Sequence, residues 1–108
     1  MSGVETTSAG AEPGADAGDR RPSCVVTIVN KRGLHARAAA KFVETAGRFS
    51  AAIDVTRGGQ SVSGRSIMGL MMLAAGPGSA IEISADGDDA DSALDALRTL
   101  VENGFDED

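Results

Sequence analysis

The chain has 108 residues, and its formal net charge at pH 7 is −6, with 16 Asp or Glu against 10 Lys or Arg. This acidic balance and the lack of Trp and Tyr argue against nucleic-acid binding, which needs an excess of Lys and Arg and usually aromatic stacking. A single cysteine, Cys24, excludes an internal disulfide framework and a cysteine-rich zinc site, and it is consistent with a reducing compartment.

The length and the distribution of apolar residues predict one folded domain. No stretch is apolar over the length needed to span a bilayer, and the N-terminus lacks the basic-then-apolar pattern of a secretory signal. We therefore expect a cytoplasmic protein without membrane insertion. Residues 1–22 are rich in Gly, Ala, Ser, Thr and acidic side chains, which predicts a disordered arm before a domain at residues 23–108.

A strand and a helix are the first predicted elements. Residues 24–29, CVVTIV, are mostly β-branched and predict a strand, with turn chemistry at residues 30–33. Apolar side chains at helical spacing follow at Ala39, Phe42, Val43 and Ala46. They predict a helix that begins near Ala36 and ends at Gly47, a typical C-cap residue.

A hairpin is predicted next. Residues 51–56 alternate between apolar and polar, with Ile53 and Val55 facing one way. Residues 57–59, RGG, are a tight-turn signal, and residues 60–63 return as a short second strand.

The segment SIMGLMMLAA predicts a short helix with Ser66 as its N-cap, ended by residues 76–78, GPG. It has no polar face, so part of its apolar surface must remain exposed if all helices lie on one side of a sheet. We expect Leu70 and Leu73 in the core. The expected exposed patch consists of Ile67, Met68 and Met71.

The last two predicted elements are a strand and a helix. Residues 80–85 alternate like a strand, and a helix begins among Asp88, Asp89 and Asp91, whose charges suit a helix N-terminus, and ends at Gly104. The apolar side of this helix carries Ala90, Ala93, Leu94, Leu97, Leu100 and Val101.

The predicted order is therefore β-α-β-β-α-β-α. The strands also carry polar residues that would face water, namely Thr27, Asp54, Thr56, Glu82 and Ser84. A sheet with one solvent-exposed face predicts an α+β fold, an open-faced two-layer β-sandwich with three helices on the other face of a four-stranded antiparallel sheet.

His35, the single histidine, is expected just before the first helix. The backbone N–H groups of Ala36, Arg37 and Ala38 would then be unpaired donors at the positive end of the helix dipole, which predicts an anion site. The Arg37 guanidinium could bind phosphoryl oxygens in a bidentate manner, and Gly33 would let the loop approach them closely. Basic side chains gather nearby: Lys31, Arg32, Arg37, Lys41 and Arg48.

Other roles for His35 are also compatible with these residues. On spacing alone, a surface or capping histidine without chemistry fits as well as an anion site. No second His, cysteine cluster or ligand-spaced carboxylates accompany it, so we expect no metal site, and no serine lies in a nucleophile-elbow pattern.

The segment VTIVNKRGLHARAAAKF resembles the active-centre segment of the histidine-containing phosphocarrier family, HPr and its nitrogen-related branch NPr, of the phosphoenolpyruvate-dependent phosphotransferase system. GRSIMGLMML resembles the family's regulatory-serine helix, ISADGDDA its last strand and turn, and NGFDED the end of the NPr branch. The resemblance runs from about Cys24 to the C-terminus.

The resemblance implies that His35 accepts a phosphoryl group on Nδ1 from phosphorylated Enzyme I, charged by phosphoenolpyruvate, and passes it to an Enzyme IIA-type protein. Arg37 would stabilise the phosphorylated state, in a monomeric carrier that is not an enzyme and has no cofactor. The helix after Ser66 is where HPr-like proteins meet these partners, so Ile67, Met68 and Met71 would dock them.

Two positions, Ser66 and Ala38, relate to the family pattern in different ways. Ser66 matches the serine that an ATP-dependent HPr kinase modifies in some bacteria, although a plain N-cap explains it on sequence alone. Ala38 replaces the proline typical of the family, which restores a backbone N–H donor in the first turn.

Two other functions stay open on the sequence: a regulatory domain that binds a small anion non-covalently at His35, and an interaction module that uses the Met-rich patch alone. The sugar or nitrogen branch is also open, because the ending is NPr-like whereas RSIMGLM is closer to sugar-type HPr.

Overall fold

The computed structural model describes residues 21–107, and the arm predicted at residues 1–22 lies outside them apart from its last two residues. Of these two, Pro22 accepts a hydrogen bond through its carbonyl oxygen from the Ala85 N–H (3.0 Å). Within the described chain, no helix has both the length and the apolar character needed to cross a membrane.

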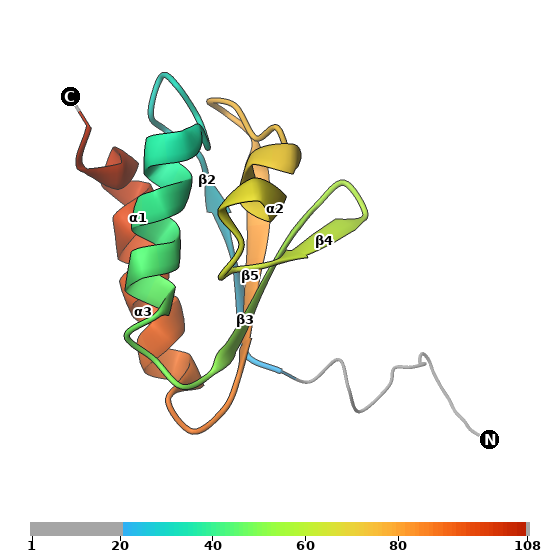
Figure 1. Ribbon diagram of the computed structural model, residues 1–108, viewed down its shortest axis with the longest axis vertical. Helices are drawn as coiled ribbons and strands as arrows, with labels where there is room; N and C mark the ends of the chain where they lie inside the picture. Colours follow the sequence, from blue (N-terminus) through green and yellow to red (C-terminus); the bar gives the residue numbers. More distant parts are fainter. Residues whose placement is uncertain (1–20, 108) are drawn as a thin grey trace.

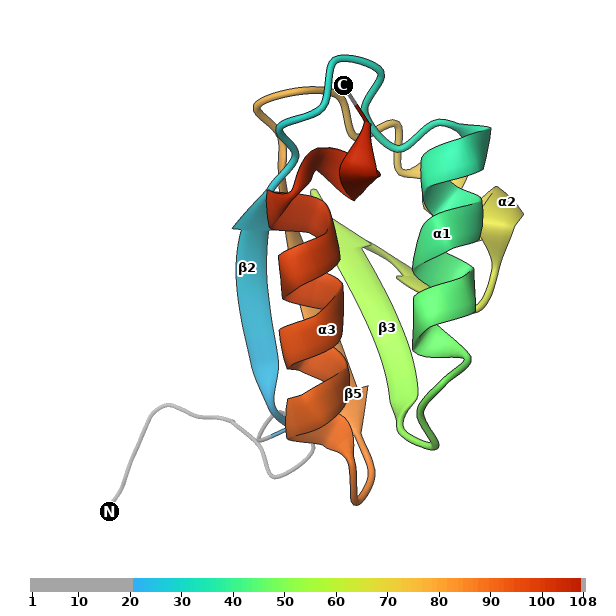
Figure 2. The same ribbon diagram turned by 90° about the vertical axis from the view of Figure 1, so that its left-hand side faces the viewer.

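The described chain has the predicted order of strands and helices, followed by one additional 3-10 turn. In chain order the elements are β2 (Ser23–Thr27), α1 (Ala36–Ala46), β3 (Ala52–Arg57), β4 (Gln60–Ser63), α2 (Ile67–Met72), β5 (Ala80–Asp86), α3 (Ala90–Glu102) and η2 (Gly104–Asp106). The strands form one antiparallel sheet in the order β2-β5-β3-β4. All three helices cover the same face of this sheet (Figures 1 and 2), so the predicted open-faced sandwich is confirmed.

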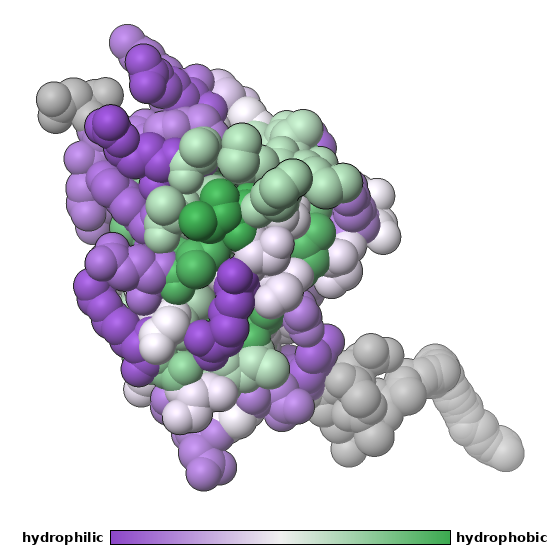
Figure 3. All heavy atoms as spheres, in the orientation of Figure 1, coloured by the Kyte–Doolittle hydropathy of each residue, from purple (hydrophilic) through white to green (hydrophobic). Residues whose placement is uncertain are grey.

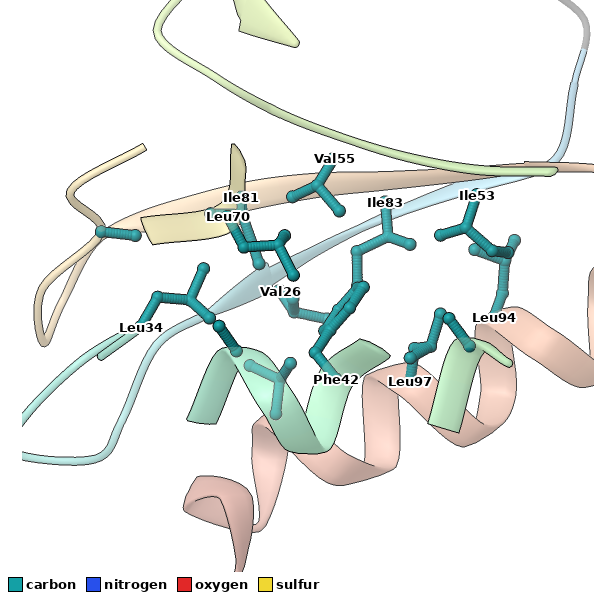
Figure 4. Packing of buried hydrophobic residues seen from close by; sticks show 14 of the residues in the cluster. Val26, Leu34, Phe42, Ile53, Val55, Leu70, Ile81, Ile83, Leu94 and Leu97 are labelled. Carbon is teal, nitrogen blue, oxygen red and sulfur yellow. The ribbon is translucent and has the colours of Figure 1, made fainter. Parts of the chain in front are cut away.

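The core lies between the sheet and the helices. Val26, Ile83 and Val55 point from neighbouring strands toward the helices, and Phe42 of α1 reaches in from the opposite side (Figure 4). Phe42 is fully buried. The polar residues that alternate with these strand positions are exposed or half-buried on the open face, as their spacing predicted.

The first strand is shorter than predicted, because regular pairing stops at Thr27 and does not reach Val29. Ile28 still pairs irregularly, donating its N–H to the Ser79 oxygen and accepting from the Gly78 N–H (2.8 Å each). Val25 and Val29 are exposed, since alternate side chains of a strand point away from the core. A run of β-branched residues therefore overstated the length of this strand.

Two helix ends differ from their expected chemistry, whereas the start of α3 agrees with it. Gly47 caps α1 in a right-handed conformation (φ −67°), so the left-handed freedom of glycine is not used there. The α2 helix ends at Met72, before the predicted stop at residues 76–78, because Ala74 takes a left-handed conformation (φ 53°). The α3 helix begins among the aspartates as predicted, with Asp89 before it and Asp91 in its first turn, and the Asp89 carboxylate accepts hydrogen bonds from the N–H groups of Ser50 (2.8 Å) and Ala51 (2.9 Å).

Candidate functional site

Three segments distant in sequence meet at one end of the molecule (Figures 1 and 2). They are the loop between β2 and α1, the loop before β5, and the C-terminal turn η2. His35 lies in the first of them, at the N-terminus of α1. The fold therefore brings the predicted reactive residue next to parts of the chain that sequence reasoning did not connect with it.

His35 is the N-cap of α1, as predicted. Its backbone is extended (φ −76°, ψ 178°), and its carbonyl oxygen accepts the first helical hydrogen bond from the Ala39 N–H (2.8 Å). Its ring Nδ1 accepts a hydrogen bond from the Arg37 N–H (3.3 Å). The imidazole is therefore turned so that Nδ1 faces the positive end of the helix dipole.

The residues predicted to hold an anion next to this ring differ in the exposure of their side chains. Ala36 and Arg37 are exposed, whereas the side chain of Ala38 is fully buried in the core, so Ala38 can serve a bound anion through its backbone N–H alone. Gly33 is buried and left-handed (φ 64°), a conformation that favours glycine.

Charged side chains surround the histidine in an open pocket of about 360 Å³. The pocket is lined by Lys31, Arg32, His35, Arg37, Lys41, Asp106 and Glu107. Four of the five basic side chains expected around the histidine line this pocket, whereas Arg48 does not. The His35 side chain is 23% exposed. Such a pocket suits a small, strongly charged anion that is reached from outside.

Sequence reasoning missed Glu107, which contacts the ring directly. Its Oε2 atom is hydrogen-bonded to His35 Nε2, and its Oε1 accepts from the Asn30 side-chain amide (3.1 Å). The hydrogen bond from His35, followed by the one from Asn30, holds the pKa of the Glu107 carboxyl below its usual range. The segment NGFDED was noted for its resemblance, but nothing in its spacing predicts a contact with a residue 72 positions away.

The C-terminal hook, residues 104–107, holds Glu107 in place. Phe105 is fully buried, and its carbonyl oxygen accepts a hydrogen bond from Lys41 Nζ (2.6 Å). Gly104, Phe105 and Asp106 all have left-handed φ values, which turn the chain back over the β2–α1 loop. A buried aromatic ring and a lysine of α1 thus fix the approach of the carboxylate to the histidine.

The apolar patch predicted on α2 is present and larger than expected. Leu70 and Leu73 are buried, as predicted. The exposed members and their exposed fractions are Ile67 (40%), Met68 (72%), Met71 (42%) and Met72 (65%), of which Met72 was not predicted. Figure 3 shows hydrophobic surface at the place of α2 in Figure 1, bordered by hydrophilic side chains over α1. Ser66 caps the helix by accepting from the Gly69 N–H (2.9 Å).

The patch is continuous with the histidine. A shallow pocket between them is lined by Arg32, Leu34, His35, Met71, Ala74, Ala75 and Gly76. Its backbone is fixed by a hydrogen bond from the Leu34 N–H to the Ala75 oxygen (2.9 Å). Within residues 21–107 no group of three or more His, Cys, Asp and Glu is arranged to hold a metal ion.

Comparison with known proteins gives consistent matches. Residues 22–103 match the family model described as the phosphorylation site of the PTS HPr component. The chain is 52% identical over 87 residues to phosphocarrier protein HPr of Pseudomonas aeruginosa, which covers 80% of this chain and 97% of that protein. It is 49% identical over 82 residues to phosphocarrier protein NPr of Shewanella violacea, with 76% and 90% covered.

Solved structures agree in fold. The crystal structure of HPr from Thermoanaerobacter tengcongensis superposes with a TM-score of 0.77 at 44% identity, covering 81% of this chain and 98% of that one. The phosphocarrier protein HPr from Bacillus anthracis gives a TM-score of 0.73 at 44% identity, with 77% and 99% covered.

Proposed function

The chain belongs to the HPr family of phosphocarrier proteins of the phosphotransferase system, and from this premise we propose that His35 is the residue that carries the phosphoryl group. The observation that carries the proposal is the position of the ring. The single histidine of the chain caps α1 with Nδ1 toward the helix N-terminus, inside a pocket lined by basic side chains.

In the proposed reaction the lone pair of His35 Nδ1 attacks the phosphorus atom of a phosphohistidine on Enzyme I, itself charged by phosphoenolpyruvate. The new bond forms between Nδ1 and phosphorus, and the old nitrogen–phosphorus bond breaks with its electron pair returning to the donor ring. Transfer to an Enzyme IIA-type protein is the same step in reverse direction. The protein acts as substrate and donor in a relay and not as an enzyme with its own turnover.

Arg37 and the backbone N–H groups of residues 36 and 38 are proposed to stabilise the phosphoryl oxygens. The Arg37 side chain is exposed next to the ring, and a guanidinium can bind two phosphoryl oxygens at once. The N–H groups precede the first helical hydrogen bond, which starts at Ala39, so they are oriented as donors toward an anion at the helix N-terminus.

Enzyme I and Enzyme IIA-type proteins are proposed to dock on the exposed patch of α2, through Ile67, Met68 and Met71 together with Met72. Support comes from the continuity of this patch with the histidine through the shallow pocket beside Met71. Flexible thioether side chains suit a surface that meets more than one partner. We propose further that the carrier works as a cytoplasmic monomer and that an HPr kinase/phosphorylase modifies Ser66 where such an enzyme is present.

The test is phosphoryl labelling with phosphoenolpyruvate and a catalytic amount of Enzyme I. We expect one label per chain that is lost in mild acid and survives base, and no label on His35→Ala. Because the chain has one histidine, labelling of His35→Ala to the wild-type level would overturn the assignment. No observation favours the alternative of a domain that binds a small anion non-covalently.

The branch is tested by the acceptor. The labelled protein is mixed with a nitrogen-type or a sugar-type Enzyme IIA, and the transfer rates are compared. We propose the nitrogen type as the faster acceptor because of the NGFDED ending, and faster transfer to the sugar type would reverse that choice.

A further inference from the structure

We propose that Glu107 is a positioning residue that holds the ring proton of His35 on Nε2 before, during and after phosphoryl transfer. The inference rests on the proposed function of His35 as the phosphoryl carrier. It assigns to the C-terminal hook the choice of which ring nitrogen reacts.

The two hydrogen bonds to the ring define its tautomer. A neutral imidazole has one N–H donor and one acceptor nitrogen. Nδ1 faces the Arg37 N–H at 3.3 Å and must therefore be the acceptor. An ionised carboxylate accepts hydrogen bonds and donates none, so Nε2 must supply the proton in its contact with Glu107. Both partners select the same tautomer, in which the Nδ1 lone pair is available for attack.

Asn30 fixes the orientation of the carboxylate. Asn30 as a residue is 7% exposed, and its amide nitrogen donates both to the Gly33 carbonyl oxygen (2.8 Å) and to Glu107 Oε1 (3.1 Å). The two hydrogens of the amide are thereby used, and Oε2 remains for the histidine. A buried amide that links the β2–α1 loop to the hook restricts the carboxylate more than a surface ion pair would.

The proton on Nε2 matters most after transfer. When Nδ1 has formed its bond to phosphorus, the ring with its Nε2 proton is a cation, and the Glu107 carboxylate beside it offsets this charge. In onward transfer the Nδ1–phosphorus bond breaks and its electron pair returns to Nδ1. With the proton in place the departing group is a neutral imidazole, whereas without it the departing group would be an imidazolate, a far stronger base and a poorer leaving group.

The remaining charges around the ring act in the opposite direction. The cationic side chains that line the same pocket are Lys31, Arg32, Arg37 and Lys41. They repel the cationic ring that forms when Nδ1 is phosphorylated, since like charges repel each other. Asp106 also lines the pocket, but among residues 21–107 Glu107 is the carboxylate that contacts the ring. Holding the proton in this basic pocket therefore depends on that one contact.

The first test uses the unphosphorylated protein, with nitrogen-15 NMR of the His35 ring at a pH where it is neutral. We expect the wild type to have its proton on Nε2 and Glu107→Gln to raise the Nδ1-protonated fraction about tenfold, because a hydrogen bond to an ionised group is lost. Glu107→Asp should restore the wild-type pattern in part. Asp106→Asn removes the same charge from the same pocket without removing a ring contact, so its ring shifts should match the wild type.

The second test follows onward transfer from the isolated phosphorylated protein. For each variant, the transfer rate to one Enzyme IIA-type acceptor is measured at pH 6.5 and pH 9, and the ratio of the two rates is compared. Raising the pH from 6.5 to 9 should slow transfer by Glu107→Gln about tenfold more than it slows transfer by the wild type. The ratio of the two rates for Asp106→Asn should stay at the wild-type value. A merely structural role would change both rates and leave the ratio unaltered.

The outcomes separate this inference from the proposed function. If the wild type takes no label on His35, the proposed function fails. If the label forms but Glu107→Gln keeps both the wild-type tautomer and the wild-type pH ratio, the role of Glu107 is overturned and the carrier function stands. Thermal unfolding of each variant checks that the fold is retained.

Discussion

Gly33 lies directly against the carbonyl group of Ala75. A Cβ atom added to Gly33 would lie 2.4 Å from the Ala75 oxygen, far inside the contact distance of two such atoms. Gly33 also has a left-handed φ of 64°. The loop that precedes His35 is thereby held against the segment that follows α2, with no side chain between them.

Gly33→Ala should therefore destabilise the protein by about 2 to 5 kcal/mol, from backbone strain and overpacking together. The matched control is Gly58→Ala, where φ is also left-handed (58°) but nothing lies within 4 Å of the added Cβ. That control should cost about 1 to 2 kcal/mol, the strain alone. Denaturant unfolding measures both, and equal losses would show that the close approach to Ala75 carries no energy.

Arg37→Ala should slow acceptance of the phosphoryl group about 100-fold, because one charged donor to the transferring oxygens is removed. Arg37→Lys should recover part of the rate, since it restores the charge but not the two-pronged geometry. Arg48→Ala, which removes an exposed base at the other end of α1, is the control and should keep the wild-type rate. Rapid-quench labelling gives the rates. Equal slowing by both alanine variants would mean that Arg37 acts only through the overall positive charge of the protein and not through contact with the phosphoryl oxygens.

Ala38→Pro should shorten the lifetime of the phosphohistidine about two- to fivefold without preventing transfer. The substitution removes one backbone donor at the helix N-terminus, which is worth about 0.5 to 1 kcal/mol where water competes. The decay of acid-labile phosphate at neutral pH measures the lifetime. Identical decay of the variant and the wild type would mean that this N–H does not contact the phosphoryl group.

Ser66→Ala should cost about 1 kcal/mol of stability, because its hydroxyl caps α2 by accepting from the Gly69 N–H. Ser66→Asp should keep the stability, since aspartate caps helices as well as serine does. It should nevertheless slow phosphoryl acceptance several-fold, because it puts a charge beside the apolar patch at Ile67 and Met68. If Ser66→Asp accepts as fast as Ser66→Ala, a negative charge at this position does not control docking.

Asp89→Asn should lower the melting temperature at pH 7 by more than the neighbouring Asp88→Asn does. The hydrogen bonds from the backbone N–H groups of Ser50 and Ala51 hold the pKa of Asp89 below its usual range. A carboxyl with a lowered folded-state pKa stabilises the fold above its unfolded value, and this contribution is lost as the pH falls through the folded value.

The difference between the Asp89→Asn variant and the wild type should accordingly be full at pH 7 and shrink below about pH 4, near the ordinary carboxyl value. Melting curves between pH 2 and pH 7 measure it. A difference that stays constant over this range would mean that packing, and not the charge of Asp89, holds the loop before β3.

The sequence predicted the element order and the faces of the sheet because those features are local. Alternation in residues 80–85 and helical spacing around Phe42 each depend on neighbours a few positions apart. Ends of elements were less well predicted, because they depend on the partner. The exposed Val29 has the residue type of a strand but follows the last regular pairing of β2 with β5.

Only those residues of the candidate site that lie close to His35 in the sequence were predicted. His35 at the start of α1 follows from a helix boundary, which short-range pattern reveals. Glu107 and Asn30 act on the ring through contacts that exist after the chain has folded, and neither has a distinctive spacing. The hydrogen bonds between Asp89 and the loop at Ser50 were not predicted for the same reason, since the sequence showed only that the charge of Asp89 suits a helix N-terminus.

The shared face of the histidine and the α2 patch has a kinetic consequence. If donor and acceptor both dock on Met71 and its neighbours, the two cannot occupy the carrier together, and each round of the relay needs one complete dissociation. Throughput is then limited by how fast partners leave, and strengthening the patch beyond a certain point would slow the relay. Modest, quickly reversed association is therefore the useful regime for such a surface.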